Sequence, residues 1–303
     1  MKKFVVKLII FGFCIYVVDL IFGFTFSFLQ DRASFGNWQR FRYINNEMKD
    51  EIVIMGSSRA AHHYVPQVFE DSLKMSCYNC GVDGNGILMF WANYQMFTER
   101  YTPKLIIYDL SGFDIMRDDH STYMGWLRAY YDKECVQNVF DDLDSIEKYK
   151  MFSNLYRWNF KFIQLFTDNI AAFVASEKGY KPLSGVMNYT PGKDNNAITD
   201  NADCFVHDDL KLAYLENMIL SCKEKGIKLI FTISPMYGVT SSIRFNKIFE
   251  LAKQNNCSVI DYFASPKYAR NNKYFKDSSH MNDDGAREYT SDVCHEIKNI
   301  ISQ

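Results

Sequence analysis

Two short stretches, far apart in the chain, carry residue types that can make and break ester bonds. The first is "MGSSRAAHH", residues 55–63, in which two serines, an arginine and two histidines follow a glycine. The second is "DSSHMNDDG", residues 277–285, in which Asp277 and His280 form an Asp-x-x-His pair. A serine nucleophile needs a base to take its proton, and the base needs a carboxylate to fix its tautomer. Taken together, the two stretches predict a serine-dependent acyl-transfer site.

The first stretch also admits other interpretations. His62 lies four residues after Ser58, so the two would share a face of a helix, but no carboxylate lies at a matching spacing. His62 and His63 make a poor metal site, because adjacent residues on regular structure point apart. The segment could simply end a strand and cap a helix with a serine. Arg59 could bind an anionic group of a substrate or pair with an acidic neighbour.

Apolar runs alternate with helical patterns along most of the chain. Strands are expected at residues 51–56, 75–81, 104–110, 227–234 and 257–263, and helices at 86–100, 208–225, 241–256 and from about 282 to the end. Near-continuous apolar runs are typical of strands that are buried on both faces of a parallel sheet. The pattern therefore predicts an α/β fold with three layers and a mostly parallel sheet.

The first 30 residues are expected to lie outside the globular fold as a membrane anchor. Lys2, Lys3 and Lys7 precede an apolar run from Leu8 to about residue 29, long enough to cross a hydrocarbon core. Asp19 inside this run is costly, and it would be tolerated if it faced a partner helix. The lysines at the amino-terminal flank predict a cytoplasmic N-terminus and an exported remainder. A cleaved signal or a soluble apolar helix is the alternative.

The chain after the anchor is expected to contain one domain. Residues 31–49 are predicted to be a linker, and residues 50–303 the domain, interrupted by an insert at about 115–206. The insert is rich in aromatic residues and could roof a site at the carboxyl ends of the strands. Its aromatics could equally pack a small helical subdomain.

The composition excludes some partners and a disulfide framework. The chain of 303 residues has a net charge of −2, so nucleic acid is not expected as a partner. Of its eight cysteines, Cys14 lies in the anchor, which leaves an odd number outside. Cys77 and Cys80 form a Cys-x-x-Cys in an extended run, where residues three apart point to opposite sides. They are expected to be buried structural thiols.

Four blocks in order resemble the SGNH/GDSL hydrolase superfamily, over residues 51 to the C-terminus. They are "MGSSR", "NCGVDGNG", "LIIYDLSGFD" and "DSSHMNDDG". The chain is most similar to a divergent branch of membrane-anchored proteins that transfer acyl groups on cell-envelope polymers. The resemblance implies a three-layer α/β/α sandwich, flavodoxin-like, with no cofactor and no metal.

The resemblance also implies roles for individual residues. Gly56-Ser57-Ser58 aligns with Gly-Asp-Ser, which makes Ser58 the nucleophile, His280 the base and Asp277 its orienting carboxylate. Gly84 would donate its N–H to the oxyanion. In the third block Phe113 takes the place of the asparagine that usually donates to the oxyanion, and Asn85 is the candidate substitute.

The expected function is that of an esterase or O-acyltransferase. Its substrate would be an acylated glycan of the cell envelope or a small acyl ester, with the membrane and possible envelope-biosynthesis proteins as partners. The Phe113 departure motivates an alternative, in which the protein keeps the fold as a non-catalytic binding or assembly module.

Overall fold

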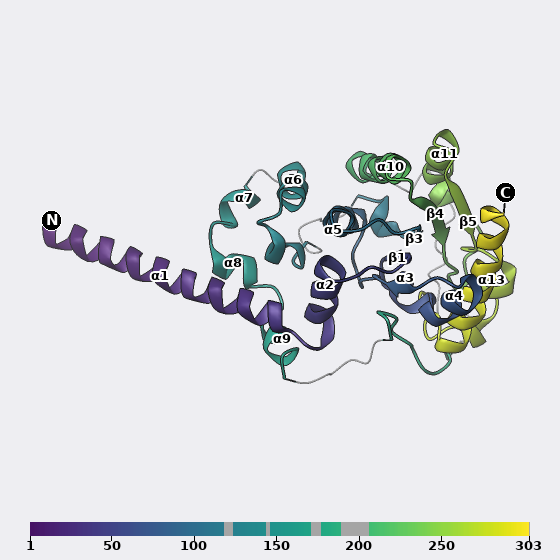
Figure 1. Cartoon of the computed structure of the whole chain (residues 1–303), viewed down its shortest axis with the longest axis horizontal. Coiled ribbons are helices and arrows are strands. Elements are labelled where there is room, and N and C mark those ends of the chain that lie inside the picture. The colour runs from purple at the N-terminus through teal and green to yellow at the C-terminus, as the bar shows by residue number, and fades with distance from the viewer. Residues whose placement is uncertain (118–123, 144–145, 171–176, 189–205, 303) are drawn as a thin grey trace. The chain divides into compact units, whose positions relative to one another are not determined.

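The computed structural model describes residues 1–117, 124–143, 146–170, 177–188 and 206–302 (Figure 1). The chain divides into two compact units. One comprises Met1–Glu47 and His120–Ala175, and the other comprises Met48–Asp119 and Ser176–Gln303.

The second unit is built on a parallel sheet. Its strands are β1 (Ile52–Gly56), β2 (Cys77–Asn79), β3 (Leu105–Asp109), β4 (Lys228–Ile233) and β5 (Ser258–Asp261), in the order β2-β1-β3-β4-β5. The apolar runs of β1 and β3 are buried along their whole length, as central strands of a parallel sheet require. This order is that of doubly wound, flavodoxin-like sheets. The predicted α/β fold with a mostly parallel sheet is confirmed.

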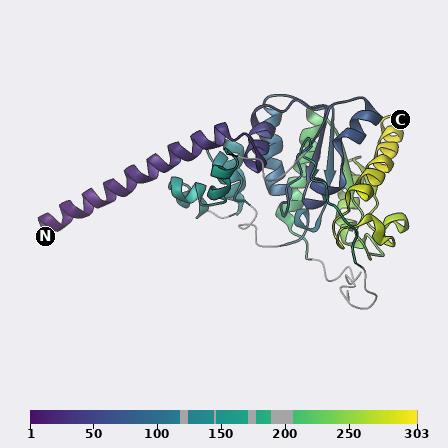
Figure 2. The same cartoon turned by 90° about the horizontal axis from the view of Figure 1, so that it is seen from below.

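Helices cover both faces of this sheet (Figure 2). They are α3 (Ser58–His63), α4 (Pro66–Leu73), α5 (Ile87–Thr98), α10 (Asp209–Glu224), α11 (Asn246–Gln254), α12 (Pro266–Ala269) and α13 (Asp283–Ile301). Ile107 of β3 lies in one apolar cluster with Tyr289 of α13. The next residue, Tyr108, makes an edge-to-face contact with Phe90 of α5. Because successive side chains of a strand point to opposite faces, α13 and α5 lie on opposite sides of the sheet.

The turn after β1 depends on a glycine. Gly56 has φ +137°, and a Cβ there would lie 2.5 Å from the carbonyl oxygen of Asp109 on the neighbouring strand. Any other residue would clash with β3 and be strained. The chain can therefore turn sharply from the sheet into α3 and place Ser57 and Ser58 at the carboxyl edge of the sheet.

The first unit is helical. It contains α1 (Lys2–Arg32), α2 (Gly36–Asn46), the 3₁₀ turn η3 (Leu127–Tyr130), α6 (Glu134–Leu143), α7 (Glu147–Lys150), α8 (Asn154–Trp158) and α9 (Phe162–Thr167). α1 is long and apolar enough to cross a membrane.

The linker expected at residues 31–49 is largely helical in the structure. Trp38, Phe41 and Ile44 recur at three-residue spacing, so they share one face of α2, and all three are buried. Trp38 contacts the ring of Trp126 edge-on, and Phe41 stacks on the same indole. Burial of these rings holds the segment in a helix.

The expected insert at residues 115–206 does not behave as one piece. Its residues 120–175 belong to the first unit, whereas residues 177–188 belong to the second, where Lys181 N–H donates to the carbonyl oxygen of Ala61. The polar loop expected at residues 184–204 lies mostly outside the described residues.

Cys77 and Cys80 of the Cys-x-x-Cys are both buried, as expected. Burial raises the pKa of the Cys77 thiol well above its ordinary value, which favours the inert, neutral form.

Candidate active site

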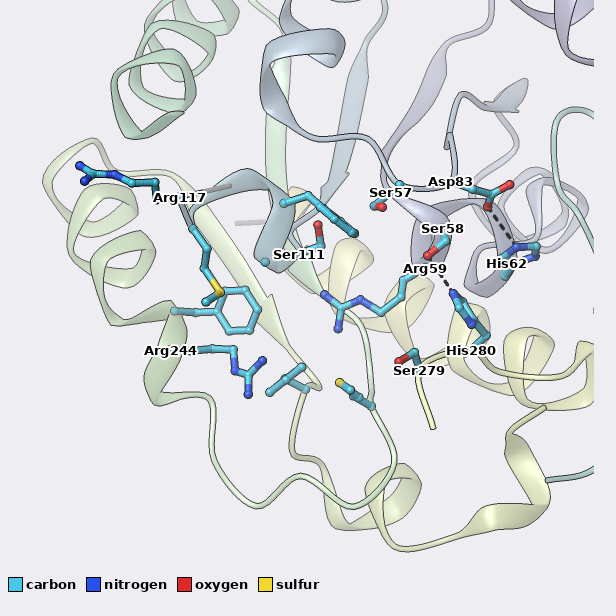
Figure 3. Close-up of a pocket in the computed structure, with 17 residues that line it drawn as sticks. Ser57, Ser58, Arg59, His62, Asp83, Ser111, Arg117, Arg244, Ser279 and His280 are labelled. Carbon is cyan, nitrogen blue, oxygen red and sulfur yellow. Dashed lines mark hydrogen bonds and ion pairs between the residues drawn. The ribbon is translucent and has the colours of Figure 1, made fainter. Parts of the chain in front are cut away.

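Ser58, His280 and Asp277, from the two distant stretches, lie in one chain of contacts, of which Figure 3 shows Ser58 and His280. The Nε2 atom of His280 lies 2.8 Å from the Oγ of Ser58. The other ring nitrogen, Nδ1, lies 3.0 Å from both carboxylate oxygens of Asp277. Since an ionised carboxylate only accepts, Nδ1 carries the proton and Nε2 is left to accept from the serine. This arrangement can deprotonate Ser58.

The Asp277 carboxylate is held in its ionised form by its own loop. Partial burial would raise its pKa, but the backbone N–H groups of Ser279 and His280, each 2.9 Å from Oδ1, and the His280 ring outweigh this effect. The net result is a pKa below the ordinary value for aspartate. The tight Asp-x-x-His turn thus supplies an anion that fixes the tautomer of His280.

The two adjacent serines have different surroundings. Ser58 is the first residue of α3, and its hydroxyl faces His280. Ser57 is the N-cap residue and is buried, and its Oγ makes no hydrogen bond within the described part of the chain. Only Ser58 therefore has a base that could activate it.

Ser58 opens into a cavity of about 770 Å³. The side near the triad is polar and includes Ser57, Arg59, His62, Asp83 and Ser279. The rest of the lining includes Gly84, Ser111, Gly112, Phe113, Met116, Arg117, Met236, Arg244, Phe245 and Phe263. The loops after β1, β2, β3, β4 and β5 all contribute, because parallel strands end at the same edge. The cavity therefore joins the Ser58 hydroxyl to a wall that is mostly apolar but includes Ser111, Arg117 and Arg244.

The residues expected at the oxyanion lie in different environments. Gly84 has φ +68° and lines the cavity with Ser58. Asn85 is buried, and its side-chain amide donates to the carbonyl oxygen of Asp83 at 2.8 Å. Its amide group thus stabilises its own turn, and Asn85 is not among the residues that line the cavity. Phe113, in the place of the usual asparagine, does line it.

Arg59 is buried beneath the site. Its guanidinium donates to the carbonyl oxygens of Leu110 and Ser234, and its Nε lies 3.9 Å from Oδ2 of Asp109. Burial raises the pKa of Asp109, and the charge of Arg59 opposes that shift. Two roles were considered for Arg59, and the structure shows one of them, the pairing with an acidic neighbour, Asp109. The side chain also lines the cavity, so a substrate contact stays a prediction.

His62 belongs to a network that the sequence did not reveal. Its Nδ1 lies 2.7 Å from the carbonyl oxygen of Lys181, and its Nε2 lies 3.2 Å from Oδ1 of Asp83. The Lys181 ammonium also binds Asp83 at 2.8 Å. The ring of His62 packs edge-on against His280, with centroids 5.4 Å apart. The only sign in the sequence of a role for Asp83 near the site is that it directly precedes Gly84.

The neighbouring His63 points elsewhere. It is fully buried, and its Nε2 accepts from the N–H of Met281 at 2.9 Å. Burial, with the nearby charge of Arg59, lowers the pKa of His63 well below its ordinary value. His62 and His63 therefore do not converge, and the described residues contain no group of three or more side chains suited to a metal ion.

Comparisons with known proteins bear on the fold. No protein-family model matches the chain, and no curated protein matches it. Solved structures do. A GDSL-like lipase from Bacteroides thetaiotaomicron is 12% identical, with a TM-score of 0.40 over 86% of this chain and 98% of that one. The acetylxylan esterase Axe2 from Geobacillus stearothermophilus is 10% identical, with a TM-score of 0.41 over 84% and 96%. The acetyl xylan esterase AlAXEase is 14% identical, with a TM-score of 0.39 over 82% and 99%.

The positions of the four blocks on the sheet agree with the resemblance seen in the sequence. Ser58 follows β1, Gly84 follows β2, Phe113 follows β3 and the Asp-x-x-His follows β5. The chain has an α/β fold with a parallel five-stranded sheet. The chemistry has to be assigned from the side chains of this chain itself.

Proposed function

We propose that the protein is a serine-dependent enzyme that acts on acyl esters. The observation that carries this proposal is the chain of contacts from Asp277 through His280 to Ser58, at 3.0 Å and 2.8 Å. In this reaction His280 Nε2 takes the proton of Ser58 Oγ while Oγ bonds to the acyl carbon. His280 then gives that proton to the departing alcohol oxygen, and an acyl-Ser58 intermediate remains.

The second half of the reaction reverses the proton path. A water molecule or a sugar hydroxyl loses its proton to His280 as its oxygen attacks the acyl carbon. The bond to Ser58 Oγ breaks, and Oγ recovers the proton. Water makes the protein an esterase, whereas a sugar hydroxyl makes it an O-acyltransferase. The negative charge of Asp277 stabilises the imidazolium that forms in both halves.

An exported or cell-envelope glycan is the proposed substrate. The cavity of about 770 Å³ is large enough to admit the alcohol part of an ester as well as its acyl group. α1 would anchor the chain in the membrane as a single span. Lysines before the apolar run favour a cytoplasmic N-terminus, so the catalytic unit would lie outside the cytoplasm.

A non-catalytic glycan-binding module is the second candidate. It is motivated by Phe113, which occupies the place of an oxyanion-binding asparagine and lines the cavity. An aromatic side chain can pack against a sugar or an acyl chain without any turnover. In that case the Ser58–His280 contact would be a remnant.

Covalent labelling distinguishes the two candidates. The full chain in detergent micelles is treated with a fluorophosphonate, and the adduct is located by mass spectrometry in wild type, Ser57→Ala and Ser58→Ala. An enzyme gives an adduct on residue 58 that only Ser58→Ala abolishes. Wild type that neither labels nor hydrolyses small acetyl esters supports the binding module. Product analysis with and without an added oligosaccharide then separates hydrolysis from transfer.

A further inference from the structure

One face of α1 is covered by the helices that follow residue 145. Along the 31 residues of α1, the buried positions are Asp19, Gly23, Phe26 and Gln30. Their spacing of four, three and four places them on one side of the helix. α8 and α9 pack along this side, within the same compact unit (Figure 1). Apart from Val17 and Leu29, which are half-buried, the remaining large apolar side chains of α1 stay exposed.

Asp19 is the polar centre of this contact. Its carboxylate accepts hydrogen bonds from Ser153 Oγ at 2.8 Å and from the side-chain amide of Asn154 at 3.0 Å. It also accepts from the backbone N–H groups of Asn154 at 2.8 Å and Leu155 at 2.9 Å. Four donors around one carboxylate are what a charge needs where water is scarce. The partner helix that could make Asp19 tolerable is α8 of this same chain.

The close approach of α8 depends on a small residue in α1. A Cβ at Gly23 would lie 2.4 Å from Cγ of Asn154. One turn further on, the ring of Phe26 contacts those of Trp158, Phe162 and Phe166. A small residue at a helix contact followed by apolar packing is typical of helices that associate inside membranes.

The length of α1 places this contact within the membrane. The apolar run before Asp19, residues 8–18, spans about 17 Å at ~1.5 Å per residue. A hydrocarbon core is about 30 Å thick. If Lys7 marks one boundary, such a core holds roughly 20 residues and extends about eight residues past Asp19. The segment that binds Asp19 then lies at the same depth.

The covering helices expose apolar side chains of the kind that lipid would bury. Phe152 and Ile170 are each 79% exposed, and Ile163 is 66% exposed. Other exposed apolar side chains of this segment are Ile146, Tyr149, Leu155, Phe162 and Phe166. Such a density is unusual for a surface in water, and it adjoins α1, where Phe26 contacts Phe162 and Phe166.

We propose that the segment 146–170 is embedded in the membrane leaflet at the carboxyl end of α1. Lipid acyl chains cover Phe152, Ile163 and their neighbours, and Asp19 joins the embedded segment to the spanning helix. The protein is thus attached to the bilayer twice, by the membrane-spanning helix α1 and by the segment 146–170 at the interface.

Photo-crosslinking of the full chain in vesicles tests this proposal. A benzophenone amino acid is introduced in place of Phe152 or Ile163, and the protein is reconstituted in phosphatidylcholine with phosphatidylglycerol at about 3:1. Ile9 is the control for the span, and Asn138, exposed on α6 of the same unit, is the control for water exposure. We expect lipid adducts by mass spectrometry from positions 9, 152 and 163 and none from 138.

The other outcomes overturn the proposal in different ways. Lipid adducts from position 9 alone would mean that α1 spans the membrane but that the segment stays in water. Crosslinks from positions 152 and 163 to a second protein chain would mean that a protein covers this face. Absence of adducts at position 9 would mean that α1 does not cross the membrane, and this would overturn the proposal. Ester hydrolysis by the same samples reports on Ser58 separately.

Discussion

The Nε2 atom of His280 lies 2.8 Å from the Oγ of Ser58, although the two residues are 222 positions apart in the chain. Ser58 begins α3 directly after β1, and His280 lies in the turn that leads into α13. α3 and α13 pack on the same face of the sheet, which brings the turn to the carboxyl end of β1. The proposed base and nucleophile thus come from opposite ends of the chain.

Replacing Asp277 by asparagine tests the orienting carboxylate. An amide in this position lets His280 take the tautomer with its proton on Nε2, which can no longer accept from Ser58. We expect kcat for a small acetyl ester to fall about 10³–10⁴-fold, with little change in KM. Asp284→Asn, an exposed carboxylate in the first turn of α13, is the matched control. Full activity in Asp277→Asn would exclude the triad.

The network of His62, Asp83 and Lys181 predicts a coupled effect on turnover. It fixes the turn that carries Gly84 against the helix that carries Ser58. His62→Ala and Asp83→Asn should each lower kcat about tenfold, which corresponds to about 1.4 kcal/mol. The double variant should be little worse than either single one, because both break the same contact. Additive losses in steady-state kinetics would show that the two side chains act independently.

Phe113→Asn tests whether the unusual third block limits the rate. A side-chain oxyanion donor contributes about 10²–10³ in kcat where it is present. Because Phe113 already lines the cavity with Ser58, an asparagine there should reach the site, and we expect kcat to rise tenfold or more. Phe113→Leu, which supplies no donor, is the control. A fall in kcat/KM in both variants would instead assign the ring to substrate binding.

The buried carboxyl of Asp114 predicts a pH-dependent stability. Burial raises its pKa to about 6, although hydrogen bonds from Tyr108 and Ser111 oppose the shift. The folded state therefore holds this proton more tightly than the unfolded state, whose aspartate titrates near 4. The stabilisation is complete below pH 4 and is lost as the pH rises through 6, by about 3 kcal/mol. Asp114→Asn cannot ionise, so its stability should fall less between pH 4 and 7.

Denaturant unfolding at several pH values provides that measurement. The slope of the unfolding free energy against pH is the quantity to compare, because the asparagine also changes the hydrogen bonds to Tyr108 and Ser111. Parallel slopes in wild type and Asp114→Asn would mean that Asp114 is already ionised at pH 4 in the folded protein.

Local sequence patterns were sufficient for the strands, the main helices and the Asp-x-x-His turn. Apolar runs such as Ile52–Gly56, bounded by turn residues and alternating with helical patterns, indicate buried strands of a parallel sheet. Asp277 and His280 interact across three residues, so their pairing needs no long-range information. The alternation of strands and helices predicted the parallel sheet. The family resemblance then placed Ser58 beside the distant Asp277 and His280.

Contacts between residues far apart in sequence were decided by the tertiary structure. Periodicity does not show that Asp83 lies beside His62. His62 is on the helix after β1 and Asp83 is in the loop after β2, so the pairing of β1 with β2 brings them together. Nor does periodicity show that the side chain of Asn85 donates to the carbonyl oxygen of Asp83. It also does not show that burial of Trp38 keeps the expected linker helical. Asp19 is the clearest case. Its charge suggested a partner helix as one way to tolerate it, but only the packing of α8 against α1 showed which backbone groups bind it.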